Sequence, residues 1–292
     1  MNTREKNCYD ERIRRVCDYI SQNLDEHLTL ERLSEVAAFS KYHFHRLFAA
    51  CTGQSLMNFI LLARMRRASF RLAFEPGYRI TDIAFEAGFN SSEAFSRAFK
   101  RLFEQTPSQF RQSPEWSEWH KKFEFDLPTS GTDTMNVQIV DFQETPVALI
   151  EHRGAPERVY ETAARFIAWR KSSGLSPVET SKTYGIPHGD PNRVDPDEFR
   201  FDICGSIDVA VPENQYGVRA ATIPGGRCAV VCHKGSHDTL DECVYRLYRE
   251  WLPESGETLR DYPCFFHYLN FVHEVNECDL VTYVYLPLNE HR

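Results

Sequence analysis

The stretch Ala37-Ala-Phe-Ser-Lys-Tyr-His-Phe-His-Arg-Leu-Phe48 returns about 50 residues later as Ala87-Gly-Phe-Asn-Ser-Ser-Glu-Ala-Phe-Ser-Arg-Ala-Phe99, with one residue added in its turn. In each copy, apolar residues at helical spacing precede the turn and follow it. Gly88 suits a left-handed position that ends the first segment. Two short helices joined by a tight turn are typical of a helix-turn-helix unit. The repeat therefore predicts two such units within one all-α domain, which we place at residues 1–112.

A long helical pattern at residues 55–74 joins the two copies and stops at Pro76-Gly77. Another helix is predicted at residues 11–23, and Thr106-Pro107 is typical of an N-cap followed by proline at the first helical position. The joining helix is rich in arginine, at positions Arg64, Arg66, Arg67 and Arg71.

The second helix of each unit carries the side chains that we expect to contact DNA. With Phe44, Phe48, Phe95 and Phe99 facing inward, the outward set is Tyr42, His45 and Arg46 in the first unit and Ser92, Glu93, Ser96, Arg97 and Lys100 in the second. Arginine can bind guanine edges or phosphates, and the hydroxyl and imidazole groups can bind base edges. A helical bundle with a solvated charged face is the alternative, but two matching copies favour DNA binding.

Residues 11–112 resemble the DNA-binding domain of the AraC/XylS family of transcription regulators. The matching segments are Leu28-Thr-Leu-Glu-Arg-Leu33, Phe39 to Phe48, Thr52-Gly-Gln-Ser55, Ile80-Thr-Asp-Ile-Ala84, Ala87-Gly-Phe-Asn-Ser91, Phe95 to Lys100 and Thr106-Pro-Ser-Gln-Phe-Arg111. The resemblance implies that the two units enter successive major-groove faces of double-stranded DNA. Glu93 and Glu104 depart from the family pattern, which usually has a neutral polar residue and a glycine there.

The second half of the chain has a different pattern. Residues 113–134 contain Pro114, Pro128 and Ser130-Gly131, which indicates a linker. Residues 135–292 are predicted to form an α+β domain of two strand-helix-strand-strand repeats. The motif Ala148-x-x-x-His152-Arg-Gly154 recurs as Ala229-x-x-x-His233-Lys-Gly235, at a spacing of 81 residues. We predict strands at 137–140, 147–150, 178–186, 199–209, 218–232, 264–272 and 279–287, and helices at 157–171 and 238–251.

Two related halves would leave a cleft between them, and its candidate lining is aromatic. The residues expected to bind an effector are Phe166, Trp169, Tyr245, Tyr248, Trp251, Phe266, Tyr268 and Tyr283. Aromatic faces near carboxylates suit apolar cations. The alternative, which holds for most single rings, is that they belong to the core.

Residues 135–292 resemble the gyrase-inhibitor-like (GyrI-like) effector-binding domain. The supporting residues include Ile223-Pro-Gly-Gly-Arg-Cys-Ala-Val230, Trp251-Leu-Pro-Glu-Ser-Gly256, Pro263-Cys-Phe265 and Tyr283-Val-Tyr-Leu-Pro-Leu288. The resemblance implies a site for small hydrophobic or cationic molecules, and the domain order is similar to that of Rob-type regulators. Phe266 stands where many members have glutamate, so we expect a more apolar or neutral ligand, or a damaged site.

Charge is divided unevenly along the chain. Residues 41–112 contain 11 basic and 5 acidic side chains, whereas residues 121–292 contain 17 basic and 27 acidic ones. This division favours two modules with different partners. The 9 cysteines include no Cys-x-x-Cys pair, and neither a secretory signal nor a membrane span is visible. We therefore expect a cytoplasmic protein without a metal or cofactor. The two resemblances imply that its partners are DNA, an effector and RNA polymerase.

Enzyme and binding-protein alternatives follow from the same resemblances. Some GyrI-like proteins are hydrolases, but Phe266 replaces the candidate acid or base. A GyrI-like protein that sequesters toxins, fused to the DNA-binding domain, is a second alternative. Pro263-Cys264 is superficially similar to a DNA-alkyl repair motif, but Cys264 lies in an apolar strand, where thiols are usually inert. The sequence thus favours a transcription regulator rather than an enzyme.

Overall fold

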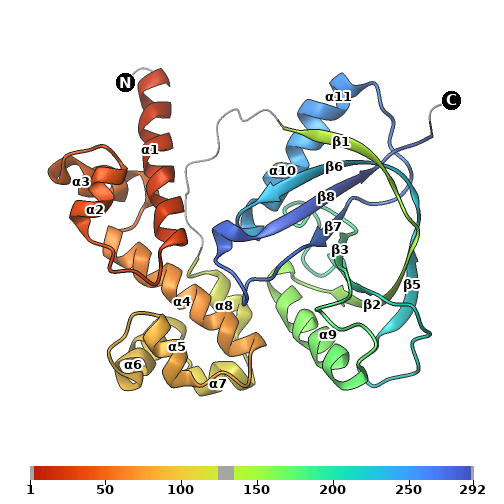
Figure 1. Cartoon of the computed structure of the whole chain (residues 1–292), viewed down its shortest axis with the longest axis horizontal. Helices are drawn as coiled ribbons and strands as arrows, with labels where there is room; N and C mark the ends of the chain where they lie inside the picture. The colour runs from red at the N-terminus through yellow and green to blue at the C-terminus, as the bar shows by residue number, and fades with distance from the viewer. Residues whose placement is uncertain (1–2, 124–134, 291–292) are drawn as a thin grey trace. The chain divides into compact units, whose positions relative to one another are not determined.

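The computed structural model describes residues 3–123 and 135–290. The chain forms two compact units: unit 1 from Met1–Thr134 with Val272–Cys278, and unit 2 from Met135–Phe271 with Asp279–Arg292. Unit 1 is helical, and unit 2 combines helices with one large sheet, as the colours of Figure 1 show. The predicted order of an all-α region followed by a strand-rich α+β region is confirmed at this level.

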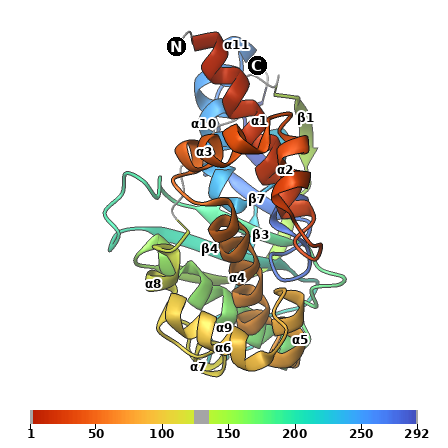
Figure 2. The ribbon, with the colours of Figure 1, turned by 90° about the vertical axis from the view of Figure 1, so that its left-hand side faces the viewer.

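The described helices of unit 1 follow the predicted repeat. They are α1 (Thr3–Gln22), α2 (Leu30–Val36), α3 (Lys41–Thr52), α4 (Leu56–Phe74), α5 (Ile80–Glu86), α6 (Ser92–Phe103), α7 (Pro107–Gln112) and α8 (Trp116–His120). The first helix-turn-helix unit is α2–α3 and the second is α5–α6. Helix α4 runs between them, and α3 and α6 lie toward its opposite ends in Figures 1 and 2.

The two turns begin with the same backbone conformation. Ala38 has φ 52° in the first turn and Gly88 has φ 80° in the second. In each turn two amide groups bond back to the preceding helix: Ala38 N to Glu35 O and Phe39 N to Ser34 O, then Gly88 N to Phe85 O and Phe89 N to Ala84 O, all at 2.9–3.0 Å. A left-handed residue that closes a helix in this way is a common C-terminal cap. The sequence repeat is therefore a structural repeat.

Buried aromatic rings hold each second helix in place. Phe44 and Phe48 on α3, and Phe95 and Phe99 on α6, have no exposed surface. Phe48 packs against Phe59 of α4 with ring centroids 5.4 Å apart. The predicted inward positions are thus confirmed. Each fully buried ring of this size contributes on the order of 2–3 kcal/mol through burial alone.

The predicted linker at 113–134 is partly folded in unit 1. Helix α8 lies inside it, and Trp116 and Trp119 are each 1% exposed. Trp119 packs on Phe123 with ring centroids 4.5 Å apart. Burial of these two large rings explains why residues 116–120 form a helix packed in unit 1, although Pro114 precedes them. The rest of the predicted linker, residues 124–134, lies outside the described residues.

Unit 2 is built on a strongly curved antiparallel sheet (Figure 1). Its described strands are β1 (Val137–Phe142), β2 (Thr145–Arg153), β3 (Thr183–Pro187), β4 (Arg200–Ser206), β5 (Arg219–Ile223), β6 (Gly226–Lys234), β7 (Phe265–Tyr268) and β8 (Val281–Pro287). Its helical segments are η1 (Pro156–Arg158), α9 (Val159–Ser173), η2 (His237–Thr239), α10 (Leu240–Arg246), the π-helical η3 (Leu247–Trp251), α11 (Leu252–Ser255) and η4 (Glu277–Asp279), of which η4 falls largely in the part of the chain grouped with unit 1.

The sheet is organised as two interlocked halves. Its strand order is β1-β6-β8-β7-β3-β4-β2-β5. Exchanging each strand of the first half with its counterpart in the second reverses this order, so an approximate two-fold axis passes between β3 and β7. Each half is strand-strand-helix-strand-strand, not the predicted strand-helix-strand-strand. The predicted strand at 218–232 is two strands, β5 and β6, because Gly226 turns the chain at φ 122°.

The duplicated histidine motif begins the helical segment of each half. His152 Nε2 lies 3.1 Å from Ala155 O, and His233 Nε2 lies 3.0 Å from Ser236 O. The glycine two residues later has φ 120° in the first copy and 121° in the second. Non-glycine residues rarely adopt this conformation. The motif therefore stabilises the turn between strand and helix, which accounts for its recurrence.

The helices α9 and α10 cover one face of the sheet, and no helix of residues 135–290 covers the other face (Figure 1). In antiparallel strands, directly paired residues point to the same face and neighbours alternate. Leu240 and Leu247 pack with Phe266 and Val284, and Phe166 packs with Ile150 on the same face. The opposite face carries a separate apolar cluster around Tyr184 and Phe265. We call these the helix-covered face and the open face.

Among the described residues, no single helix is long and apolar enough to cross a membrane; α3 and α4 meet that criterion only when counted together, across a 52° bend.

Candidate DNA and effector sites

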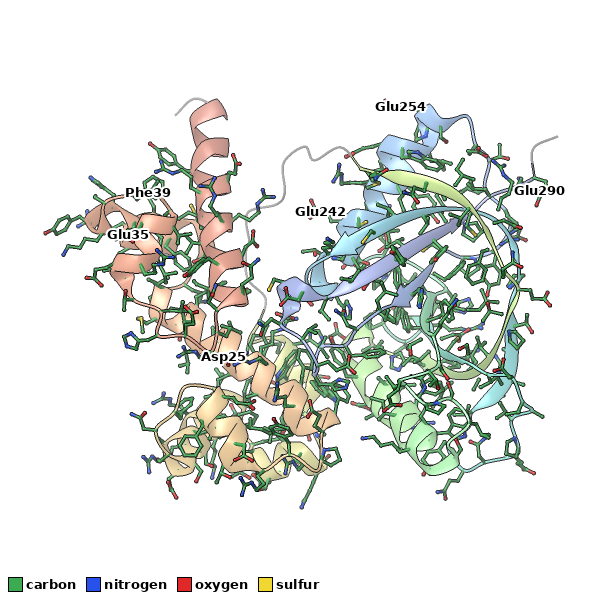
Figure 3. All side chains as sticks on the ribbon, in the orientation of Figure 1. Asp25, Glu35, Phe39, Glu242, Glu254 and Glu290 are labelled. Atoms are coloured by element: carbon green, nitrogen blue, oxygen red, sulfur yellow. The ribbon has the colours of Figure 1, made fainter. Side chains whose placement is uncertain are left out.

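Helix α3 presents its predicted contact residues to solvent. Tyr42 is 79% exposed, and His45 and Arg46 are also exposed, while the intervening Phe44 is buried. Helix α3 contains Lys41 and Arg46 and no acidic residue. In Figure 3, the labelled Glu35 and Phe39 mark the end of α2 and the turn that leads into α3. The exposed surface of α3 is therefore basic and aromatic, and its basic side chains suit contact with phosphates and base edges of DNA.

Helix α6 presents a similar surface with one acidic residue. Glu93, Arg97 and Lys100 are exposed, whereas Ser92 and Ser96 are half-buried. The Oγ of Ser91 accepts a hydrogen bond from Ala94 N at 3.2 Å and caps the helix. Backbone hydrogen bonding and the Ser91 side chain lower the pKa of Glu93, so this carboxylate is ionised at neutral pH. An ionised glutamate can accept a hydrogen bond from cytosine N4.

Only part of the predicted effector set has exposed surface. Phe166 and Trp169 are 2% and 1% exposed and stack on each other in the core. Phe266 is 6% exposed and packs with the same apolar cluster as Leu247. By contrast, Tyr245, Trp251 and Tyr268 are half-buried, and Tyr248 is 36% exposed. The partly exposed group on the helix-covered side is thus Tyr245, Tyr248, Trp251 and Tyr268.

Tyr283 lies apart from this group. It pairs directly with His267 on β7, so the two point to the same face of the sheet. Phe266 and Tyr268, the neighbours of His267, point to the other face. The structure therefore brings Phe266 and Tyr268 together on the helix-covered face and places Tyr283 on the open face. The alternation of side chains along a strand determines these faces. The sequence did not show which residues share a face with the helices, because both faces of these strands are apolar.

Strands β3 and β7 pair with each other at the approximate two-fold axis. There Gly185 of β3 pairs with Phe266 of β7, and Thr183 pairs with Tyr268. A Cβ atom at Gly185 would lie 2.5 Å from Phe201 Cζ and 2.7 Å from Tyr268 Oη. Glycine is thus required for the Tyr268 ring to lie across β3. The ring of His237 contacts that of Tyr268, with centroids 5.0 Å apart.

A buried arginine, which the sequence pattern did not reveal, lies next to this point. Arg170 of α9 is 4% exposed, and its Nη1 donates to Thr183 Oγ1 at 2.8 Å and its Nη2 to Ser176 Oγ at 3.2 Å. Its Nε has no hydrogen-bond partner among the described residues. Burial lowers the pKa of Arg170 to about 10, so it remains a cation at neutral pH. A helical pattern of apolar residues gives no indication that one charged neighbour turns inward.

Acidic groups lie near the partly exposed Tyr245. Its hydroxyl donates to Asp190 Oδ2 at 2.7 Å, which raises the pKa of Tyr245. Asn192 Nδ2 donates to Asp241 Oδ2 at 3.0 Å. The guanidinium carbon of Arg249 lies 4.7 Å from the Tyr245 ring centre. Carboxylates thus lie near Tyr245, and the carboxylate of Asp241 also acts on Tyr268, whose strand partner Thr183 binds the buried cation Arg170.

The open face has its own polar cluster. His188 Nε2 lies 2.7 Å from Asp202 Oδ2, to which Arg200 Nη2 also donates at 3.2 Å. Asp202 is 3% exposed. Its burial raises the pKa of the carboxyl, but the hydrogen bonds from His188 and Arg200 outweigh that effect and lower it. Asp202 therefore stays ionised and holds β4 and the segment after β3 together.

Within residues 3–123 and 135–290, no group of three or more His, Cys, Asp or Glu side chains is placed to hold a metal ion. Cys264 lies next to Phe265, and burial raises the pKa of its thiol to about 11. At neutral pH this thiol is protonated and a poor nucleophile.

Comparison with known proteins identifies both units. The family described as "GyrI-like small molecule binding domain" matches residues 135–289, more than half of the chain. The chain belongs to the GyrI-like family. Ahead of this GyrI-like domain, a family described as "Helix-turn-helix domain", of the AraC type, matches residues 33–113. Both resemblances drawn from the sequence are confirmed, and the GyrI-like chain is a DNA-binding regulator with a small-molecule-binding domain.

Relatives of the GyrI-like chain cover either one domain or both. "Probable transcriptional regulator YgiV" of Escherichia coli (strain K12) is 46% identical over 155 residues, 53% of this chain and 97% of that protein. "Right origin-binding protein" of the same strain is 28% identical over 264 residues, 85% of this chain and 86% of that protein. Among solved structures, the "Cryo-EM structure of EcmrR-DNA complex in EcmrR-RPo" has a TM-score of 0.46 at 13% identity and covers 90% of this chain and 99% of that chain.

Proposed function

We propose that this GyrI-like regulator binds a specific double-stranded DNA site through α3 and α6. The observation that carries the proposal is the match between the two outward surfaces. The second helix of each helix-turn-helix unit buries two phenylalanines and exposes an arginine, Arg46 or Arg97, at the same position. The exposed charged residues of the two helices are Lys41, Arg46, Glu93, Arg97, Lys100 and Arg101. Five of these six are basic, which supports contact with phosphates as well as bases.

The DNA test starts from a site selected out of random duplexes. We expect Arg46→Ala and Arg97→Ala each to weaken binding to that site by about 1–3 kcal/mol in a gel-shift titration, because each removes a contact to a base edge or phosphate. Lys171→Ala is the charge-matched control, since Lys171 is exposed on α9 of unit 2. Equal binding by wild type and both arginine variants would remove the two helices from the interface.

We further propose that unit 2 binds a small hydrophobic effector at the partly exposed aromatic group of the helix-covered face. Support comes from Tyr268, Trp251 and their neighbours, which offer aromatic surface beside the two-fold axis. The apolar Phe266 favours a neutral ligand body at the Tyr268 end. A cationic group, where a ligand has one, is better accommodated near Asp190 and Tyr245.

Ligand charge separates these possibilities. A pair of ligands of the same shape, one neutral and one cationic, is titrated by calorimetry against wild type and Phe266→Glu. We expect wild type to bind the neutral member at least as tightly, and Phe266→Glu to shift the preference toward the cation. Phe266→Ala is the control for lost volume. Tight binding of the cation by wild type, unchanged in Phe266→Ala, would contradict the proposal.

RNA polymerase is the third partner that we propose, on the strength of the regulator class alone. In transcription with purified polymerase, the chain should change the yield from a promoter with its site placed outside the polymerase footprint. Removing the site from the template is the control. A change in yield only when the site overlaps the footprint would indicate simple blocking of DNA.

Hydrolase activity is the competing function. The two groups closest to such chemistry are the Asp202–His188 pair on the open face and the protonated Cys264. Neither lies at the position of Phe266, where the resemblance implies the acid or base. We therefore propose that the chain is not an enzyme. Turnover of an ester or epoxide library, lost in Asp202→Asn, would overturn this.

A further inference from the structure

Three arginines share one side of α4. Arg64, Arg67 and Arg71 are spaced by three and four residues, which places them above one another along a helix. The side chain of Arg67 is 12% exposed and that of Arg71 is 22% exposed. These side chains extend across the surface of unit 1 rather than into solvent, so they are not arranged to bind phosphates. Their contacts within unit 1 show a different role.

On one side, the arginines hold the loop between α1 and α2, just before the first helix-turn-helix unit. Arg64 Nε donates to Leu24 O and Arg64 Nη2 to Glu26 O, both at 2.8 Å. Arg67 donates from both Nη atoms to the carboxylate of Asp25, one contact being 3.2 Å. Figure 3 labels Asp25, which lies beside α4. Four donor groups thus fix three consecutive loop residues.

On the other side, the same arginines hold the second helix-turn-helix unit at its turn. Arg67 Nη2 donates to Glu86 O, the last residue of α5, at 2.9 Å. The guanidinium of Arg64 packs on Gly88, where an added Cβ would lie 2.6 Å from Nη1. Arg71 Nη1 pairs with Glu86 Oε2 at 2.7 Å, and among the described residues its guanidinium forms no hydrogen bond with residues 24–26. Arg64 and Arg67 therefore each contact both the α1–α2 loop and the second helix-turn-helix unit, whereas Arg71 binds the second helix-turn-helix unit.

We propose that Arg64 and Arg67 are positioning residues that set the spacing of the DNA site. They lock the α1–α2 loop and the α5–α6 turn to one side of α4, and so fix the separation and relative rotation of α3 and α6. A planar guanidinium can bond to two partners in fixed directions, which a lysine ammonium cannot do. This inference rests on the proposed binding of DNA by both recognition helices.

A fixed separation has a measurable consequence for the preferred DNA site. Changing the number of base pairs between the two half-motifs by one moves one motif by about 3.4 Å and rotates it by about 35° relative to the other. A rigid pair of helices loses one set of base contacts when that happens. A loosened pair recovers part of those contacts by adjusting. The arginines thus determine specificity for spacing without touching DNA.

The test is a spacing profile. Duplexes carrying the selected site with zero, one or two base pairs added or removed between its half-motifs are titrated against the full chain. We expect wild type to lose about tenfold or more in affinity at one base pair, and Arg67→Lys and Arg64→Lys to lose about threefold, because their helices can adjust. Arg71→Lys is the matched control and should keep the wild-type profile, since Arg71 binds the second helix-turn-helix unit and does not hold the α1–α2 loop.

Two outcomes separate this inference from the proposed function. If wild type selects no bipartite site, the proposed mode of DNA binding fails. If wild type shows a sharp profile and Arg67→Lys shows the same profile at lower affinity throughout, the positioning role is overturned. Asp25→Asn gives an independent check in case an arginine variant unfolds, because it removes the charged partner of Arg67 and leaves both arginines in place.

Discussion

Single residues with unusual backbone conformations show where the two helix-turn-helix units differ. Helix α3 ends at Gly53 with φ 67°, and α6 ends at Glu104 with φ 61°, at equivalent places in the repeat. Residues with a Cβ atom adopt this left-handed conformation at a cost of roughly 1–2 kcal/mol. Glu104 is exposed, so its side chain has no apolar burial to offset that cost. The departure from glycine noted in the sequence is therefore a point of strain.

We expect Glu104→Gly to raise the free energy of unfolding of unit 1 by about 1 kcal/mol, because the relief of strain exceeds the entropy gained by the unfolded chain. Gly53→Ala is the matched control at the other unit and should lower it by a similar amount. Thermal and urea denaturation of the full chain measure both. Destabilisation by Glu104→Gly would mean that the glutamate side chain makes a contact of its own.

The sequence predicted the structure correctly where the spacing of apolar residues allows only one arrangement of the helices. The paired turns were predictable because Gly88 and the matching Phe-x-x-x-Phe segments define both the end of one helix and the buried side of the next. The roles of Arg64 and Arg67 were not predictable. Arginines on a joining helix look the same in sequence whether they contact phosphates or carbonyl groups of distant loops. Only the fold brings Leu24 and Gly88 to the same side of α4.

At the scale of elements, strands were harder to place than helices. The run at 218–232 was predicted as one strand, yet Pro224 and Gly225 connect two strands, β5 and β6. For the effector residues, the sequence indicated aromatic side chains but not the face of the sheet to which each one points, as Tyr283 and Tyr268 show. Strands that are apolar on both faces carry no alternation to set the register. The buried Arg170 was missed for a related reason, since charge usually indicates exposure.

Strand β7 makes the stability of unit 2 dependent on pH. Burial, with a smaller contribution from Lys182, lowers the pKa of His267 to about 4. In the unfolded chain a histidine has a pKa of about 6.5. Between these two values the unfolded chain binds a proton that the folded chain does not. The free energy of unfolding therefore falls as the pH falls through this window.

We expect His267→Gln to flatten this dependence, with little effect above about pH 7, where the histidine is neutral in both states. Hydrogen exchange of the β7 and β8 amides between pH 7 and 4 reports the local stability. His43→Gln, at an exposed position of α3, serves as the control. A slope as steep in His267→Gln as in wild type would assign the pH dependence to other groups.

At the scale of the whole molecule, a formal net charge of -8 has to be reconciled with DNA binding. Salt at 0.1 M screens exposed charges beyond about 10 Å. The local charge of the contacting surface therefore matters more than the total. On α3 and α6 that local charge is positive, as five basic residues outnumber Glu93. The acidic excess after residue 120 is compatible with DNA binding on this account.

Salt dependence then distinguishes phosphate contacts from base contacts. The logarithm of the binding constant should fall linearly with the logarithm of salt concentration, by about 0.9 for each phosphate neutralised. We expect Lys100→Ala to reduce this slope by about 1 and to weaken binding to all sequences alike. Arg46→Ala should instead lower the preference for the selected site over random DNA, because a guanidinium can discriminate guanine.

Competition titrations at four salt concentrations, with selected and random duplexes, measure both quantities for wild type and the two variants. Lys171→Ala again controls for the loss of one positive charge outside the recognition helices, and it should change neither slope nor preference. If Lys100→Ala and Arg46→Ala change only the slope, α3 and α6 hold the DNA backbone without reading the bases. Sequence preference would then have to come from the shape of the DNA.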